Sequence, residues 1–262
     1  MLNALLTIVK TVAQREIVPR YLKVAHERKV DGSVLTEADT AAQHALTEGL
    51  YALNQCPVLG EEMTPQEQHA LWTQHSQDGL WVLDPVDGTS NFANGLPYFA
   101  VSVGFYQGGL PVMGVVYAPE ANEIFWAERD KGAFLNGERL PIKTRSPDSL
   151  KHAMAGVDLK RLQPKLAAAL AAHPPYASQR NFGSSALDWC YVAAGRLDIY
   201  IHGGQKLWDY AAGALILEQA GGALCTLDHD DFWGTDPWQR SVICASDPAI
   251  FQPWRDWIRA NQ

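Results

Sequence analysis

The segment 81–92, with the sequence WVLDPVDGTSNF, constrains the fold more than any other part of the chain. Its apolar start fits a buried strand, and Pro85 then removes a backbone donor and restricts the conformation of Asp84. Asp84 and Asp87 are therefore expected to emerge together at a strand end, where α/β proteins place their chemistry. The same turn leaves the Val86 carbonyl without a strand partner, and Mg²⁺ binds carboxylate and carbonyl oxygens together.

The residues that follow match a site for an anion. If Gly88 and Thr89 open a helix, the free backbone amides of Gly88, Thr89 and Ser90 would hold a phosphate beside the cations. An ordinary strand followed by an Asp/Gly turn is the alternative, and two acids three residues apart would by themselves favour it. The longer string favours a combined metal and phosphate site.

The composition limits the class of protein. A chain of 262 residues can form one large domain or two closely packed halves. A net charge of -8 disfavours nucleic-acid and membrane-surface partners. The four cysteines have no Cys-x-x-Cys spacing, which predicts reduced thiols in a cytoplasmic protein without zinc or disulfides. Charged residues interrupt the apolar N-terminal segment, which therefore predicts a helix and no signal peptide.

The pattern of apolar residues predicts an α/β fold, with layers of helices and sheets. An N-terminal half, 1–146, should place two helices on a largely antiparallel sheet, and a second α/β half, 147–262, should pack on it to form one structural unit. The segment from Thr64 to Gly79 is expected to be a polar connection. The predicted helices span about 2–28, 36–54, 161–172, 185–195 and 208–220, and the predicted strands lie near 57–60, 98–107, 111–119, 123–128, 152–157 and 199–202.

Further acids should join the first pair. Glu61 follows a short strand as Asp84 and Asp87 do, and Asp209 heads a helical segment, although Asp209 alone would be interpreted as a helix cap. Like charges in one cleft resist ionisation, so such a cluster needs divalent cations. The acids thus predict a metal, and the metal predicts an oxyanion substrate.

Several blocks of this sequence, in the same order, resemble the inositol monophosphatase family of Mg²⁺-dependent, lithium-sensitive phosphomonoesterases. The blocks are 31–39, 60–62, 81–92, 183–186 and 208–222. The resemblance implies the layered helix and sheet sandwich of the inositol monophosphatase and fructose-1,6-bisphosphatase type. It also implies a homodimer and two or three Mg²⁺ ions in each active site.

The resemblance also implies a set of metal ligands. Glu61, Asp84 and the Val86 carbonyl would bind the first ion. Asp84, Asp87 and Asp209 would bind the second, and a weaker third ion would lie near Glu61.

The resemblance also implies a catalytic role for Glu61, Thr89 and Asp39. Glu61 and the Thr89 hydroxyl would orient the metal-bound water that attacks phosphorus, and Asp39 would accept a hydrogen bond from Thr89. One ion would lower the pKa of that water and another would stabilise the leaving alkoxide.

Substrate choice is expected around Gly183, Ser184 and Ser185, at Asp209, and at His202, where inositol phosphatases commonly carry glutamate. Neutral histidine offers one acceptor to a pair of hydroxyls, whereas glutamate offers two oxygens. The substrate is expected to be a small phosphorylated metabolite, with inositol 1-phosphate first. Fructose 1,6-bisphosphate, 3′-phosphoadenosine 5′-phosphate, histidinol phosphate and NADP are alternatives.

Two further alternatives concern surface charge and function class. Arg180 and Lys206 either attract a second phosphate or are solvated surface charges, and the solvated interpretation is favoured. In a different class, the chain would be a regulatory binding protein that retains the phosphatase fold.

Overall fold

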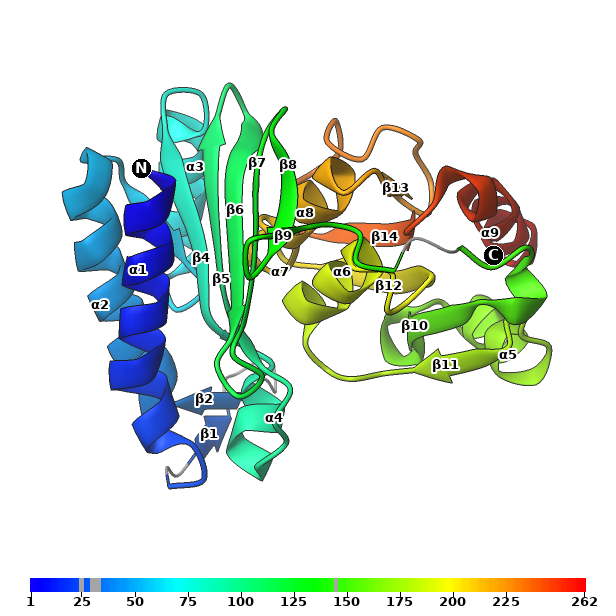
Figure 1. The fold of residues 1–262 in the computed structure, drawn as a ribbon, viewed down its shortest axis with the longest axis horizontal. Helices are drawn as coiled ribbons and strands as arrows, with labels where there is room; N and C mark the ends of the chain where they lie inside the picture. The colour runs from blue at the N-terminus through cyan, green and yellow to red at the C-terminus, as the bar shows by residue number, and fades with distance from the viewer. Residues whose placement is uncertain (24–25, 29–33, 144–145) are drawn as a thin grey trace.

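The chain folds into five layers of helices and sheets, which Figure 1 shows side by side. This computed structural model describes residues 1–23, 26–28, 34–143 and 146–262. Helices α1 and α2 form the first layer, a seven-stranded sheet the second, and α6, α7 and α8 the third. A five-stranded sheet and the pair α5 and α9 complete the stack. The predicted α/β layered fold is confirmed.

The elements have the following bounds. The α-helices are α1 Leu2–Val12, α2 Glu37–Asn54, α3 Pro65–His75, α4 Thr89–Asn94, α5 Pro164–Ala172, α6 Ser185–Ala193, α7 Leu207–Tyr210, α8 Gly213–Gln219 and α9 Pro248–Asn261. The strands are β1 His26–Arg28, β2 Val34–Thr36, β3 Val58–Gly60, β4 Leu80–Asp87, β5 Ala100–Gln107, β6 Leu110–Ala118, β7 Glu123–Glu128, β8 Gly132–Leu135, β9 Glu138–Arg139, β10 Met154–Asp158, β11 Ser178–Arg180, β12 Ile199–Gln205, β13 Ala223–Cys225 and β14 Arg240–Ala245. A π-helix, η1 Ala13–Ile17, and three short 3₁₀ turns, η2 Val18–Arg20, η3 Leu150–His152 and η4 Leu159–Arg161, complete the set.

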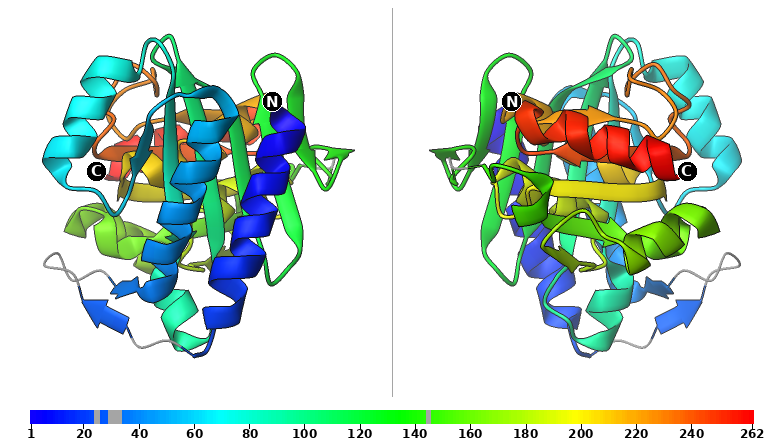
Figure 2. Two further views of the ribbon diagram at one scale, coloured as in Figure 1. Left: turned by 90° about the vertical axis from the view of Figure 1, so that its left-hand side faces the viewer. Right: turned by 90° about the vertical axis from the view of Figure 1, so that its right-hand side faces the viewer.

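The large sheet has the strand order β3-β4-β5-β6-β7-β8-β9 and is antiparallel except for the parallel pair β3 and β4. Strands β5 and β6 turn at Gly108 and Gly109, as predicted, and both glycines have positive φ. On its outer face, α1 and α2 pack against the sheet, as the left panel of Figure 2 shows. Leu46 and Leu50 of α2 are fully buried in this layer.

The small sheet has the order β11-β10-β12-β14-β13, and β10 pairs in parallel with both β11 and β12. Its far face is covered by α5 and α9, which lie across it in the right panel of Figure 2. Trp254 and Ile258 of α9 are fully buried there. Between the two sheets, Trp189 of α6 and Leu215 of α8 lie in a core that both sheets share.

The structure corrects several predicted boundaries. The N-terminal helix does not reach residue 28: α1 ends at Val12, a π-helix and a 3₁₀ turn follow, and Pro19 lies where the helical path stops. The predicted polar connection contains α3, which opens with Thr64 and Pro65. The predicted helix 208–220 is two helices, α7 and α8. Residues 29–33 lie outside the described residues, as do residues 144–145 near the expected boundary between the halves.

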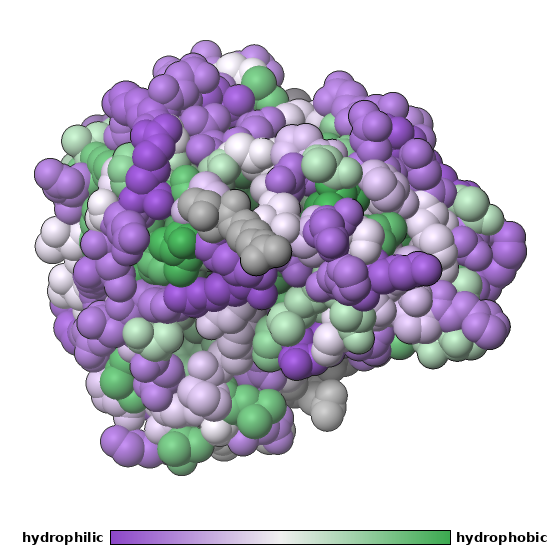
Figure 3. Space-filling model, turned by 45° about the vertical axis from the view of Figure 1, so that its right-hand side comes forward, coloured by the Kyte–Doolittle hydropathy of each residue, from purple (hydrophilic) through white to green (hydrophobic). Residues whose placement is uncertain are grey.

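In the described residues, none of the helices is both long and apolar enough to cross a bilayer. The face in Figure 3 is mainly hydrophilic, with small separate hydrophobic areas. Among large apolar side chains, Leu22 is the most exposed, at 71%. Scattered apolar residues of this kind are normal on a globular surface.

Candidate metal and phosphate site

A β-bulge in β4 brings Asp84 and Asp87 to the same side of the sheet. Asp84 pairs with Ser102 and Asp87 with Ala100, so β4 holds one more residue than β5 across this interval. Residues three apart on a regular strand point to opposite faces, and the extra residue reverses that relation. Sequence reasoning expected Pro85 to end the pairing, but β4 continues through Asp87. The proline is tolerated because β3 has already ended beside Leu83.

Asp209 completes a cluster of three carboxylates. One oxygen from each of Asp84, Asp87 and Asp209 lies within 4.8 Å of the others. Asp209 is the third residue of α7, and its Oδ2 accepts a bond from the Lys206 amide at 2.9 Å, so it both caps the helix and faces the acids. Asp84 and Asp87 are buried, at 2% and 7% exposure.

These carboxylates are electrostatically unfavourable without a cation. Burial, reinforced by Glu61, Asp87 and Asp209, raises the pKa of Asp84 well above its usual range. Burial likewise raises the pKa of Asp87 to about 6 and that of Asp209 to about 8. A buried set of oxygen donors with no sulfur or nitrogen fits a hard divalent cation such as Mg²⁺. The site therefore fits the metal that the sequence predicts.

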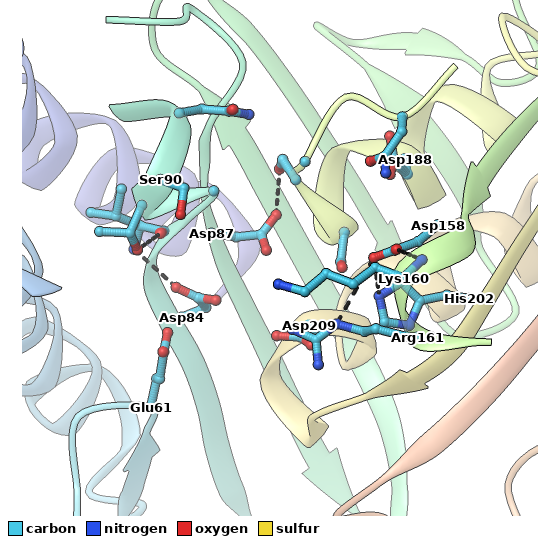
Figure 4. A pocket seen from close by; sticks show the side chains of 18 of the residues that line it. Glu61, Asp84, Asp87, Ser90, Asp158, Lys160, Arg161, Asp188, His202 and Asp209 are labelled. Atoms are coloured by element: carbon cyan, nitrogen blue, oxygen red, sulfur yellow. Dashed lines mark hydrogen bonds and ion pairs between the residues drawn. The ribbon is translucent and has the colours of Figure 1, made fainter. Parts of the chain in front are cut away.

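Glu61 lies on the same pocket but outside the cluster of three. It follows β3, and the cavity of about 330 Å³ that it helps to line is also bounded by Asp84, Asp87 and Asp209. Figure 4 shows Glu61, Asp84 and Asp87 on one side of this cavity and Asp209 on the other. A cavity of this volume accommodates a small metabolite.

Thr89 links the strand end to helix α2. Its Oγ1 lies 2.9 Å from the Val86 carbonyl oxygen and 3.1 Å from Asp39 Oδ1, two acceptors for one proton. Asp39 Oδ2 also accepts bonds from the Thr36 amide, at 2.8 Å, and from the Thr36 hydroxyl, at 2.6 Å. Burial raises the pKa of Asp39, although the Thr36 and Thr89 bonds oppose that shift.

Any residue other than glycine would be strained at position 88. Its φ is +90°, and a Cβ there would lie 3.0 Å from the Tyr98 carbonyl oxygen and 3.2 Å from that of Gly183. The following helix, α4, starts at Thr89, so the amides expected to bind phosphate do open a helix. Across the pocket, the Ser184 hydroxyl and the Ala186 amide donate to Asp87 Oδ2, which brings the 183–185 segment to the site.

Comparison with known proteins identifies the family. The model of the inositol monophosphatase family matches residues 2–256. The chain belongs to the inositol monophosphatase family. Its sequence is 34% identical over 240 residues to an inositol monophosphatase of Mesembryanthemum crystallinum, which covers 88% of this chain and 85% of that protein.

Other proteins that this chain resembles carry a different name. The chain is 44% identical over 151 residues to the Nus factor SuhB of Pasteurella multocida, which covers 56% of this chain. It spans 57% to 62% of the length of three curated relatives with that name. A solved IMPase of Thermotoga maritima matches with a TM-score of 0.83 at 25% identity, and the match covers 99% of this chain and 96% of the other.

In this member of the inositol monophosphatase family, His202 lines the pocket but is engaged by the protein itself. The Gly204 amide donates to its Nδ1 at 3.1 Å, and its Nε2 lies 3.2 Å from Asp158 Oδ2. This arrangement places the ring proton on Nε2, and burial lowers the pKa of His202. Both ring nitrogens are thus occupied.

Sequence reasoning missed seven residues that line the pocket, namely Asn91, Asp158, Lys160, Arg161, Asn181, Asp188 and Tyr200. Asp158 follows a predicted strand just as Glu61 does, so the same strand-end rule could have found it. Neither Arg180 nor Lys206 is among the residues that line this cavity. Arg180 is exposed and donates to Ser178 Oγ and to the Gln179 carbonyl.

Proposed function

We propose that this chain catalyses the Mg²⁺-dependent hydrolysis of a small phosphate monoester, with inositol 1-phosphate as the first candidate substrate. The observation that supports this function best is the convergence of Asp84, Asp87 and Asp209 opposite Glu61, in a cavity that also contains the start of α4. Family membership supports a phosphatase as the general class.

In this proposal, Glu61, Asp84 and the Val86 carbonyl hold one ion and Asp84, Asp87 and Asp209 hold a second, with room for a third near Glu61. When bound, Mg²⁺ supplies water of lowered pKa and positive charge that offsets the charge of the phosphate.

The chain itself orients the reactants. Thr89 Oγ1 directs its proton to Asp39, which leaves its lone pairs for a proton of the attacking water. Glu61 accepts the other proton of that water. The amides of Gly88, Thr89 and Ser90 hold the phosphate oxygens. The leaving alkoxide takes a proton from solvent and Glu61 returns its proton to solvent, so the products are inorganic phosphate and the free alcohol.

On the other side of the cavity, the alcohol part of the substrate lies against Gly183, Ser184 and Ser185 and near Asp209. These residues come from the second half of the chain. His202 lies in the same wall, and we propose that it acts on the substrate through Asp158, because its own nitrogens are already bonded.

The test is phosphate release from a panel of esters in the presence of Mg²⁺. The panel contains inositol 1-phosphate, fructose 1,6-bisphosphate, 3′-phosphoadenosine 5′-phosphate, histidinol phosphate and NADP, and the matched control contains EDTA. The proposal is supported if at least one ester releases phosphate with Mg²⁺ and does not release it with EDTA. If none is hydrolysed at high enzyme concentration, the chain is not a phosphatase of this kind.

A regulatory role is the second candidate, because relatives with 43% and 44% identity are named Nus factors. The net charge of -8 argues against direct contact with RNA, so a protein partner is favoured. Restoration of growth in a strain that lacks its own SuhB, by wild type and Asp87→Asn equally, would establish a role independent of hydrolysis. Failure of both would exclude this role.

Three finer properties belong to the same proposal. We propose a homodimer, inhibition by lithium and a cytoplasmic location. Light scattering, turnover as a function of LiCl concentration and cell fractionation test them in turn.

A further inference from the structure

The turn η4 places two cations in the wall of the pocket. Leu159 and Leu162 pack into the core under the small sheet, while Lys160 and Arg161 lie between them and line the same cavity as the acids. Figure 4 shows the Lys160 side chain extending into the cavity from the side that carries Asp158 and His202. The cavity therefore has Glu61, Asp84 and Asp87 on one side, and the two cations on the other side, beside Asp158 and Asp209.

The backbone of this turn is held firmly. Asp158 caps it, because its Oδ1 accepts a bond from the Lys160 amide at 3.0 Å. A Cβ at Gly203 would lie only 1.7 Å from the Arg161 carbonyl oxygen, so β12 passes directly against the turn. The two cations thus extend from a fixed base, although their side chains are exposed at the surface of the cavity.

The charge of Arg161 is engaged only in a long ion pair with Asp158, and Lys160 has no ion-pair partner among the described residues. Arg161 Nε is 3.9 Å from Asp158 Oδ2, which is too far for a hydrogen bond, and His202 already holds that carboxylate at 3.2 Å. Within the described part of the chain, no carboxylate forms an ion pair with Lys160. If Lys160 and Arg161 were only solvated surface charges, neither side chain would need to face the cavity.

We propose that Lys160 and Arg161 bind a second anionic group, carried by the alcohol part of the substrate at a distance from the phosphate that is hydrolysed. The preferred substrates are then phosphate monoesters that also carry a second phosphate or a carboxylate. This inference rests on the proposed phosphatase function and narrows its substrate class. A guanidinium and an ammonium suit either group, since both are oxyanions.

The experiment compares three linear six-carbon esters that differ at one end. Sorbitol 6-phosphate carries a hydroxyl there, sorbitol 1,6-bisphosphate a phosphate, and 6-phosphogluconate a carboxylate. We expect kcat/KM for at least one of the two-anion esters to exceed that for sorbitol 6-phosphate by about tenfold or more, the ratio for one charge-assisted contact. If only sorbitol 1,6-bisphosphate is preferred, the second group is a phosphate. If 6-phosphogluconate is preferred as well, the subsite accepts either anion.

The double variant Lys160→Ala, Arg161→Ala should reduce this preference to about threefold or less. Arg180→Ala, which removes an exposed arginine outside the cavity, is the matched control and should leave it unchanged. An equal rate for all three esters in the wild type, or an equal loss on all three in the double variant, would overturn the inference.

Calorimetry separates this inference from the proposed function. If the three esters bind with the expected preference and no ester is turned over, the anion subsite stands and the phosphatase proposal fails. If sorbitol 6-phosphate is hydrolysed and the second anion changes neither affinity nor rate, the phosphatase stands and the subsite fails.

Discussion

We expect Asp87 to have opposite effects on the metal-free and the metal-bound protein. Its pKa is raised to about 6, chiefly by burial, so the charged carboxylate destabilises the folded metal-free chain above pH 6. That destabilisation is absent below the ordinary pKa of 3.8, where the carboxyl is protonated in both states. A divalent cation reverses the sign of this effect.

Asp87→Asn should therefore stabilise the EDTA-treated protein at pH 8 by up to about 3 kcal/mol, at 1.36 kcal/mol per pKa unit. The gain should vanish near pH 4. In Mg²⁺ the same variant should bind the ion more weakly and lose roughly a hundredfold in turnover. Urea unfolding at the two pH values and Mg²⁺ calorimetry measure these effects. A variant that is less stable without metal and fully active with it would contradict the site assignment.

His202 and Asp158 form a pair that a glutamate cannot replace. In His202→Glu, two carboxylates would meet across the 3.2 Å contact, and we expect a loss of about 3 kcal/mol in unfolding free energy. His202→Gln keeps a donor for Asp158 and should lose less. Combining His202→Glu with Asp158→Asn should recover part of the loss. Equal stability of all variants would show that the pair is not structurally important.

Part of the site was predictable from residue patterns. The rule that acids follow buried strands identified Glu61, Asp84 and Asp87, because each strand is short and apolar in the sequence. The partnership of His202 with Asp158 was not predictable, since it depends on the register that places these residues side by side on β12 and β10. Sequence spacing carries no information on that register.

At the scale of elements, two helices open with the same capping box but in different surroundings. Thr36 and Asp39 form the box of α2, which is buried, while Thr64 and Glu67 form that of the exposed α3 terminus. We expect Thr36→Ala to lower the unfolding free energy by about 1–2 kcal/mol and Thr64→Ala by less than about 1 kcal/mol.

Only the first substitution should also reduce turnover, because Asp39 of that box contacts Thr89. Thermal melts and phosphate release on both variants make the comparison. If Thr36→Ala and Thr64→Ala changed turnover equally, Asp39 would have no role in catalysis.

The elements with clear periodicity were predicted well, and the others were not. The helix from 36 to 54 is confirmed at its N-cap and its C-terminus, since Thr36 marks the first and an apolar face with a spacing of three to four residues extends to the second. The last helix, α9, was not predicted: Pro253 lies inside it, and a proline in a helical segment usually argues for a boundary. The tertiary packing of Trp254 outweighs that local preference.

At the scale of the whole molecule, the two expected halves share one core. Tyr106 and Phe125 of the large sheet lie in the same cluster as Trp189 and Leu215 of the central helices. We therefore expect that fragments 1–146 and 147–262 do not fold alone, and that the full chain unfolds in one cooperative step. Far-ultraviolet circular dichroism and two-dimensional NMR spectra of each fragment test this. A native-like spectrum from either fragment would refute it.

The tight passage of β12 beneath the Arg161 carbonyl suggests how substrate range could evolve in this fold. Gly203 fixes the path of the turn, whereas the side chains at 160 and 161 form no ion pair with the cluster of Asp84, Asp87 and Asp209 in the described residues. If the proposed phosphatase function holds, we expect mutations at these two positions to alter which alcohol is accepted and to leave the proposed metal ligands in place. A library randomised only at 160 and 161, selected on different esters, would sample new specificities on an unchanged catalyst.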